Sequence, residues 1–100
     1  MNHSLSEHGN NTVLRVRGEL DALSSPELRP TLEALTQNPG RNITVDLSNL
    51  ELIDGSGLGA LISLYKRARA NGGTVSFVGL VAQPLVVFKL LKLDRIFGLS

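Results

Sequence analysis

Stretches with the two-residue period of a β-strand alternate along this chain with stretches that have the period of an amphipathic helix. The strand period occurs at residues 12–17, 42–47 and Thr74–Val78, with a weaker example at residues 4–8. Strands that alternate with helices favour a mixed, mostly parallel sheet with right-handed crossovers. The strands are apolar on one side only, so we expect the helices to cover mainly one face. The sequence therefore predicts a two-layer α/β fold.

The first predicted helix begins near Ser24. Ser24 and Glu27 have the spacing of a capping box, and Pro26 suits an early helical position. Pro30 lacks a backbone N–H, which predicts an irregular first turn or a later helix start. The apolar stripe that would face the sheet consists of Leu28, Leu32 and Leu35.

Two further helices are predicted after the second strong strand. The longer one has a basic exposed face and stops at Asn71. The shorter one runs from Pro84 to about Lys92, and residues 95–99 are expected to form a last short strand. Residues 84–93 are apolar nearly all round, so we expect a well-buried core helix, with a partner or dimer surface as the alternative. The apolar stripe of the longer helix consists of Leu58, Leu61, Ile62 and Tyr65.

Composition limits the classes of function. One hundred residues predict a single domain over residues 1–100, and a net charge of +1 gives no electrostatic case for nucleic acid. The lack of cysteine excludes disulfides and thiolate metal sites and fits a reducing compartment. No uncharged apolar run approaches the roughly 20 residues that span a bilayer, and residues 1–11 do not resemble a signal peptide. We therefore expect a cytoplasmic protein with no membrane insertion.

Residues 52–61, with the sequence L-I-D-G-S-G-L-G-A-L, are the candidate functional site. They join a strand to a helix through a turn in which Ser56 lies between two glycines. Backbone N–H groups and the dipole at a helix N-terminus favour an anion. Ser56 is therefore either an ordinary helix cap or the acceptor of a phosphate, and the residues alone leave both alternatives open.

Enzyme motifs fail at this segment. A dinucleotide fingerprint needs an acidic residue about 20 positions on, and a P-loop needs a lysine after its glycines. A nucleophile elbow would need glycines where Asp54 and Leu58 stand. The two histidines, His3 and His8, lie near the terminus, and metal-ligand spacing does not occur. We therefore expect no enzymatic activity and no cofactor.

The remaining acidic candidates have simpler explanations. Three carboxylates would form a site only if they converged in the fold. We interpret Asp21 as a loop or cap residue, Asp46 as an exposed strand position and Asp54 as a turn or N-cap residue.

The order of these features resembles the STAS domain of bacterial anti-sigma factor antagonists. V-D-L-S-N-L precedes the candidate site, G-E-L-D lies upstream and L-D-R-I-F lies near the end, so the likeness covers residues 12–99. The family motif is Asp, a small residue, Ser or Thr, Gly and then Leu-Gly. The matching residues here are Asp54, Gly55, Ser56, Gly57, Leu58 and Gly59.

This resemblance implies a phosphorylation switch. Ser56 would be phosphorylated by a cognate anti-sigma factor, a serine kinase that also supplies the ATP and metal, and a PP2C-type phosphatase would reverse the reaction. The unphosphorylated chain would bind the anti-sigma factor and free the sigma factor. The resemblance also implies that Asp54 and Gly57 shape the site and that Asp21 lies beside it. The implied partner-binding residues are Asp21, Asp54, Gly55, Ser56, Gly57 and Leu58.

Departures from the family pattern define the alternatives. Gly55 replaces the serine or alanine often found there, which implies a more mobile loop, and the final helix of many antagonists is expected to be absent. Stand-alone STAS subunits of lipid-transport ABC systems have a similar length and bind a cytoplasmic ATPase, although they often lack the acceptor serine. A scaffold that senses a small nucleotide or lipid on the glycine-rich turn is a third alternative.

Overall fold

The computed structural model describes residues 2–97. The described chain combines one mixed sheet with four helices, and the strands and helices predicted up to α3 occur in the predicted order. The strands are β1 (Asn2–His8), β2 (Asn11–Leu20), β3 (Asn42–Asp46), β4 (Leu50–Ile53) and β5 (Thr74–Val78). The helices are α1 (Ser25–Leu35), α2 (Gly55–Ala70), α3 (Ala82–Leu90) and α4 (Leu93–Ile96).

The sheet has the order β1-β2-β3-β5, with β4 paired to the far end of β2. Among the strand pairs within residues 2–97, β1–β2 is antiparallel, and β2–β3, β3–β5 and β2–β4 are parallel. The register of β2 shifts between Gly18 and Glu19, and Gly18 has a φ of +78°. This bend lets β2 pair with β3 along its first half and with β4 along its last residues.

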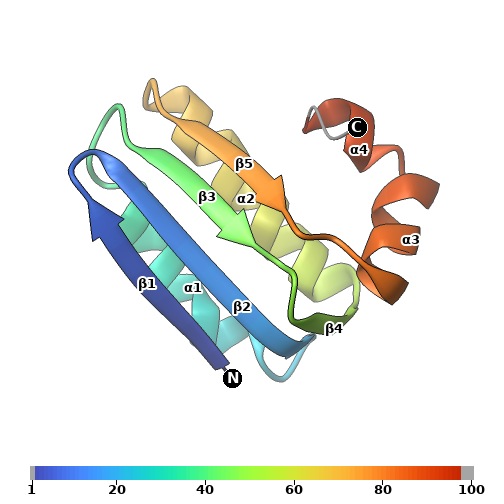
Figure 1. Cartoon of the computed structure of the whole chain (residues 1–100). Helices are drawn as coiled ribbons and strands as arrows, with labels where there is room; N and C mark the ends of the chain where they lie inside the picture. Colours follow the sequence, from blue (N-terminus) through green and yellow to red (C-terminus); the bar gives the residue numbers. More distant parts are fainter. Residues whose placement is uncertain (1, 98–100) are drawn as a thin grey trace.

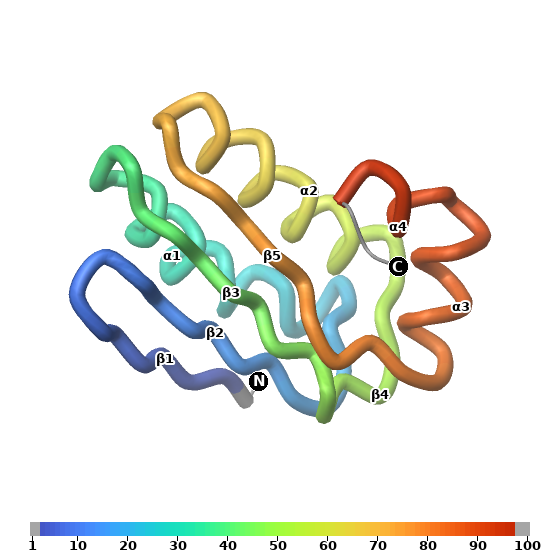
Figure 2. The backbone as a smooth tube through the Cα atoms, turned by 45° about the horizontal axis from the view of Figure 1, so that its top comes forward, coloured from blue at the N-terminus to red at the C-terminus, as the bar shows by residue number. Residues whose placement is uncertain are grey.

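Helices α1 and α2 lie on one face of the sheet, and the opposite face has no helix over it within residues 2–97 (Figures 1 and 2). The uncovered face bears polar side chains, including Arg15, which hydrogen-bonds Ser6 and lies 3.8 Å from the Asp46 carboxylate. The expected two-layer fold with a mostly parallel sheet and helices mainly on one face is therefore confirmed.

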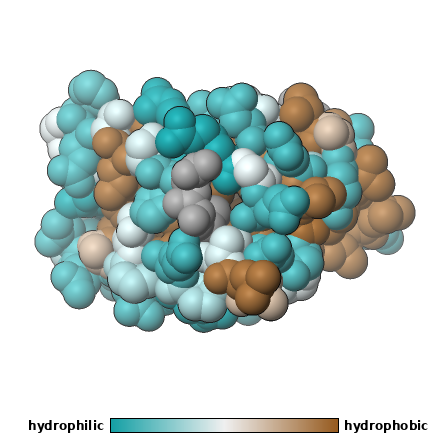
Figure 3. Space-filling model, turned by 90° about the horizontal axis from the view of Figure 1, so that it is seen from below, coloured by the Kyte–Doolittle hydropathy of each residue, from teal (hydrophilic) through white to brown (hydrophobic). Residues whose placement is uncertain are grey.

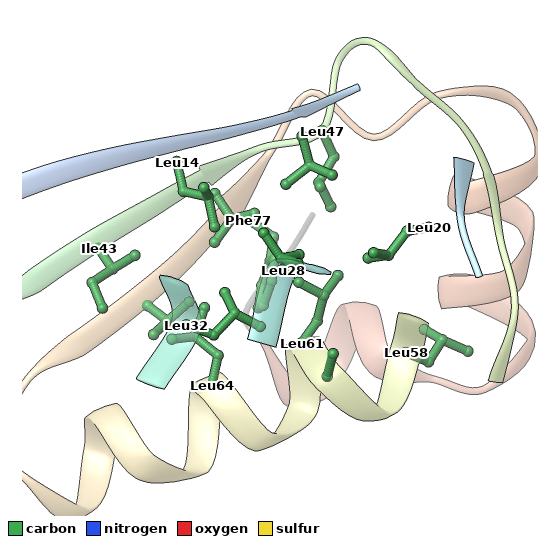
Figure 4. Close-up of a cluster of buried hydrophobic side chains, with 14 of the residues drawn as sticks. Leu14, Leu20, Leu28, Leu32, Ile43, Leu47, Leu58, Leu61, Leu64 and Phe77 are labelled. Carbon is green, nitrogen blue, oxygen red and sulfur yellow. The ribbon is translucent and has the colours of Figure 1, made fainter. Parts of the chain in front are cut away.

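The core lies between the sheet and helices α1 and α2. Many of its side chains come from the apolar faces of the predicted strands and helices, although Leu20 and Leu64 lie outside the predicted stripes. The labelled side chains point toward one another in Figure 4. Burying such side chains is the main favourable contribution to folding, at about 25 cal/mol per Å² of apolar surface. The largest fully buried side chains of the core include Leu14, Leu20, Leu28, Leu32, Ile43, Leu47, Leu61, Leu64, Phe77 and Phe88.

Helix α1 differs from the sequence prediction at its start. It begins at Ser25, so the later start proposed because of Pro30 is wrong, although a short-range bond from Glu27 N–H to Ser24 C=O marks an irregular first turn. The capping box is also wrong: the Ser24 hydroxyl makes no cap bond but donates to the Glu19 carbonyl at 2.7 Å. Buried leucines hold the helix against the sheet, so the exposed Pro30 is tolerated within it.

Two further elements differ from the sequence prediction. Strand β4 was not predicted, because four residues are too few to show a strand period. Residues 95 and 96 belong to α4 rather than to a strand, and residues 98 and 99 lie outside the described residues. Phe97, after α4, packs on Phe77 and Tyr65 with ring centroids 4.5 Å and 4.8 Å away. This aromatic contact docks α4 on β5 and α2.

Helix α3 is only half buried, so the expectation of a well-buried core helix is wrong for one of its faces. Pro84 and Phe88 are buried, whereas Val86 is 54% exposed and Leu90 is 75% exposed. Figure 3 shows hydrophobic surface gathered at the end of the molecule that α3 forms. A single sheet edge can cover only one side of a helix, which leaves the other side open.

Candidate functional site

The candidate site is the junction between β4 and α2. Asp54, after β4, has an extended backbone, and its carboxylate accepts a hydrogen bond from Gly57 N–H at 3.1 Å. The Asp54 carbonyl accepts the first helical bond, from Leu58 N–H at 2.9 Å. This is an N-cap, so the cap role proposed for Asp54 is confirmed.

Ser56 is not the cap of α2. It occupies the second helical position, is partly exposed, and makes no side-chain hydrogen bond within residues 2–97. The backbone N–H groups of Gly55 and Ser56 also have no partner in that range, as is usual in the first turn of a helix. The Ser56 hydroxyl therefore lies beside two open N–H donors at the positive end of the helix dipole.

A second loop lies against this junction. Asp21 accepts hydrogen bonds from the N–H groups of Leu23 and Ser24, both at 3.0 Å, and from the Ser24 hydroxyl. The Ser24 N–H, and then the Leu23 N–H, lowers the pKa of Asp21 below its usual value, while partial burial opposes this. The loop role predicted for Asp21 is confirmed.

Asp54 joins the two loops. One carboxylate oxygen holds the helix start, and the other accepts a hydrogen bond from Ala22 N–H at 3.2 Å. The structure thus brings Asp21 and Asp54, 33 positions apart in the sequence, into one surface next to Ser56.

The glycines of the motif have different roles. Gly57 is buried, and a Cβ there would overlap the Leu20 carbonyl oxygen and lie 2.8 Å from Leu20 Cγ. Gly55 and Gly59 are exposed, and a Cβ at either would meet nothing within 4 Å. Gly57 is therefore needed for packing, whereas the other two leave open space around Ser56. Leu58 is 7% exposed and belongs to the core.

The other candidate residues are engaged elsewhere. Asp46 accepts bonds from the hydroxyl and N–H of Ser48, which lower its pKa below its usual value. His3 Nε2 lies 3.2 Å from the Thr31 hydroxyl on α1.

The described part of the chain offers neither a metal site nor a membrane span. Within residues 2–97, no group of three His, Cys, Asp or Glu side chains could hold a metal ion. None of the helices in that range has the length and apolarity to cross a bilayer.

Two residues near the junction were not predicted from the sequence as part of the site. Leu23 is 87% exposed in the loop that contacts Asp54, and a lone leucine in a polar turn has no periodic signal. The Gln83 side chain hydrogen-bonds the backbone of Ile53, the residue before Asp54. That contact spans 30 positions and has no local signature either.

This geometry defines a small α/β domain that presents a serine at a capped helix start, beside a second loop. The family model described as "Mlab, STAS domain" matches residues 3–99 of the chain. The chain belongs to the STAS domain family.

Relatives of the chain are named as anti-sigma factor antagonists. It is 25% identical to the anti-sigma-B factor antagonist of Bacillus subtilis over 100% of this chain and 91% of that protein. It is 32% identical to the anti-sigma F factor antagonist of Paenibacillus polymyxa over 72% of this chain, but it spans only 62% of that protein.

Solved structures show the same fold. An anti-sigma factor antagonist from Mycobacterium paratuberculosis has a TM-score of 0.83 at 24% identity, with 99% of this chain and 84% of that chain covered. The Bacillus cell fate determinant SpoIIAA in its phosphorylated form has a TM-score of 0.77 at 21% identity, with 94% and 86% covered.

Proposed function

We propose that this chain is an anti-sigma factor antagonist controlled by phosphorylation of Ser56. In its unphosphorylated form it binds an anti-sigma factor that is also a serine kinase, and so releases the sigma factor. The observation behind this proposal is the Ser56 hydroxyl, which is partly exposed and has no hydrogen bond within residues 2–97. The names of its relatives support the class of partner.

The surroundings of Ser56 suit transfer of a phosphate. A kinase must bring the γ-phosphate in line with the hydroxyl, which requires close approach of two backbones. Gly55 and Gly59 present no side chain on either side of Ser56 and leave that approach open. The hydroxyl has no internal hydrogen bond to break before it attacks.

Phosphorylation would change the charge of this surface sharply. A phosphoserine adds about −1.5 to −2 charges at neutral pH. Within the free domain, the open N–H groups of Gly55 and Ser56 and the helix dipole tolerate that charge. In a contact with a partner, the same charge would be buried beside the Asp54 carboxylate, where it is costly without a matching cation. The modified chain would therefore dissociate with little change in its own fold.

Mass spectrometry after incubation with kinases tests the proposal. The purified chain is mixed with ATP, Mg²⁺ and candidate kinases encoded near its gene, and the modified residue is mapped. We expect phosphate at Ser56, none in Ser56→Ala, and unchanged modification in the control Ser48→Ala, whose hydroxyl is bonded to Asp46. Phosphate on another residue, or tight kinase binding by Ser56→Asp, would contradict the proposal.

A second candidate function follows from the description of the family model, "Mlab, STAS domain". In this alternative the chain is the STAS subunit of a lipid-transport ABC system and binds its cytoplasmic ATPase. The surface around Ser56 would then bind the ATPase permanently, without modification of Ser56. Stable binding to a transporter ATPase, with no phosphate transferred by any candidate kinase, would favour it.

A further inference from the structure

Gln83 makes a two-bond contact with the backbone of β4. Its Oε1 accepts a hydrogen bond from Ile53 N–H at 2.9 Å, and its Nε2 donates to Ile53 C=O at 3.0 Å. A primary amide has the same donor and acceptor arrangement as a peptide group. The Gln83 side chain thus takes the place that a neighbouring strand would occupy along β4.

Ile53 needs such a partner. Strand β4 pairs only with β2 among the described strands, through its other edge. Ile53 is 3% exposed, so its N–H and C=O would otherwise lie unpaired away from water. Gln83 satisfies both groups from the second position of α3.

This contact is next to the candidate site. Ile53 immediately precedes Asp54, and Asp54 N–H donates to Leu20 C=O at 3.2 Å. The start of α2 is therefore held from two sides, by β2 through Leu20 and by α3 through Gln83. Ser56 lies three residues after the clamped Ile53.

The backbone around Gln83 is strained. Ala82 has a φ of +53°, in the left-handed region that is unfavourable for an L-residue. Such strain persists where neighbouring contacts over-determine the conformation. Here the two bonds to Ile53 and the burial of Pro84 hold the start of α3 in place.

We propose that Gln83 is a positioning residue for the Ser56 site. Its side chain fixes Ile53, and through it the Asp54 cap, so that α2 presents the serine in one orientation. The start of α3 and the junction between β4 and α2 are then held together as one unit. The consequence for phosphorylation rests on the proposed function, whereas the effect on the loop does not.

Amide hydrogen exchange of the free protein tests the structural part. In Gln83→Ala we expect exchange at Ile53 and Gly57 to accelerate by about tenfold or more, as the loss of two hydrogen bonds predicts. Exchange at Ile43 in β3 should stay within about twofold, as expected for the stable core. Gln37→Ala is the matched control, since Gln37 is exposed after α1 and should change neither rate. Unchanged exchange at Gly57 in Gln83→Ala overturns the proposal.

The pH dependence of exchange in Gln83→Glu separates hydrogen bonding by residue 83 from a role in packing alone. In Gln83→Glu the ionised carboxylate cannot donate to Ile53 C=O, but the protonated acid can. The readout is Ile53 N–H, which bonds to residue 83, because Gly57 N–H bonds to the ionisable Asp54 carboxylate. Relative to the wild type at each pH, we expect fast exchange at Ile53 at pH 7 and recovery as the pH falls below about 4, near the ordinary carboxyl pKa. An exchange ratio that does not change with pH overturns the two-bond role.

Kinetics with a kinase that modifies the wild type then tests the consequence. Because positioning acts on the reacting geometry, we expect Gln83→Ala to lower kcat about tenfold with a smaller change in KM. An unchanged kcat overturns the positioning role in phosphorylation. Failure of every kinase to modify the wild type would count against the proposed function instead, and the exchange data would still decide the role of Gln83.

Discussion

Gly57 in α2 packs directly against the carbonyl group of Leu20 in β2. A Cβ at Gly57 would overlap the Leu20 oxygen and would lie 3.0 Å from Ile53 Cγ1. No positive φ is involved at Gly57, so the requirement for glycine is steric. The close approach lets the first turn of α2 lie on the ends of β2 and β4.

Gly57→Ala should therefore destabilise the domain. The added methyl must push α2 away from backbone atoms that cannot move easily, and overpacking of this kind costs about 1–3 kcal/mol. Urea denaturation measures the loss. Gly59→Ala is the control in the same helix: its Cβ meets nothing within 4 Å, and alanine should stabilise the helix by up to about 1 kcal/mol. Equal stability of the two variants would contradict the packing argument.

Removal of the Asp54 carboxylate should release both loops. Asp54→Ala loses the N-cap bond to Gly57 and the bond to Ala22, and loss of an N-cap alone costs about 0.5–2 kcal/mol. Thermal unfolding gives the stability, and amide exchange at Ala22 reports the second loop. Asp54→Asn keeps one acceptor oxygen and should retain most of the capping. Slow exchange at Ala22 in Asp54→Ala would show that the bridge does not hold the loop.

Acid should weaken the fold through Asp21 and Asp46. Hydrogen bonds lower the folded-state pKa of both carboxyl groups below the ordinary value of 3.8. Their stabilisation is thus fully present above that value and is lost as the pH falls through the lower folded-state pKa. Urea midpoints measured from neutral to acid pH should fall in this window. Asp21→Asn and Asp46→Asn should each flatten the fall, and an unchanged profile would contradict the assignment.

Leu23 should contribute to partner binding without contributing to stability. Its side chain is 87% exposed and follows the residue that bonds to Asp54. If the kinase covers this loop, Leu23→Ala should weaken binding by about fivefold or more, as for a buried interface anchor. Calorimetric titration with the kinase gives the change. Leu90→Ala, on the exposed face of α3, should bind like the wild type; the opposite pattern would place the contact on α3.

The two faces of α3 should respond differently to truncation. Phe88 is fully buried and packs on Phe77 with ring centroids 6.0 Å apart, so Phe88→Ala should cost about 3–5 kcal/mol. Leu90→Ala removes a side chain that is 75% exposed and should change stability by less than about 0.5 kcal/mol. Chemical denaturation of both variants checks this. A large loss in Leu90→Ala would show that its face is covered.

Much of the fold could be predicted because it depends on local periodicity. The strands at residues 12–17 and Thr74–Val78 and the stripe of α2 are visible from neighbouring residues alone. The prediction failed where a segment was too short to show a period, or where its apolar residues surrounded the helix on all sides. Strand β4 has four residues, and the apolar run 84–93 gave no sign of which side would be covered.

The candidate site shows the same division. The motif identified Asp54 as a turn or N-cap residue and left Ser56 either a cap or a phosphate acceptor. In the structure, Asp54 is the N-cap residue of α2, and the Ser56 hydroxyl has no hydrogen-bond partner within residues 2–97. The roles of Ser56 and its neighbours in phosphorylation and binding stay predictions.

The sequence by itself determined the family, the longer strands and helices and the serine between glycines, because periodicity and short motifs are properties of adjacent residues. Only the tertiary structure decided what surrounds that serine. The contacts of Asp54 with Ala22, of Gly57 with Leu20 and of Gln83 with Ile53 each join residues 30 or more positions apart. Such contacts exist only once the sheet and helices have packed, so no local pattern records them.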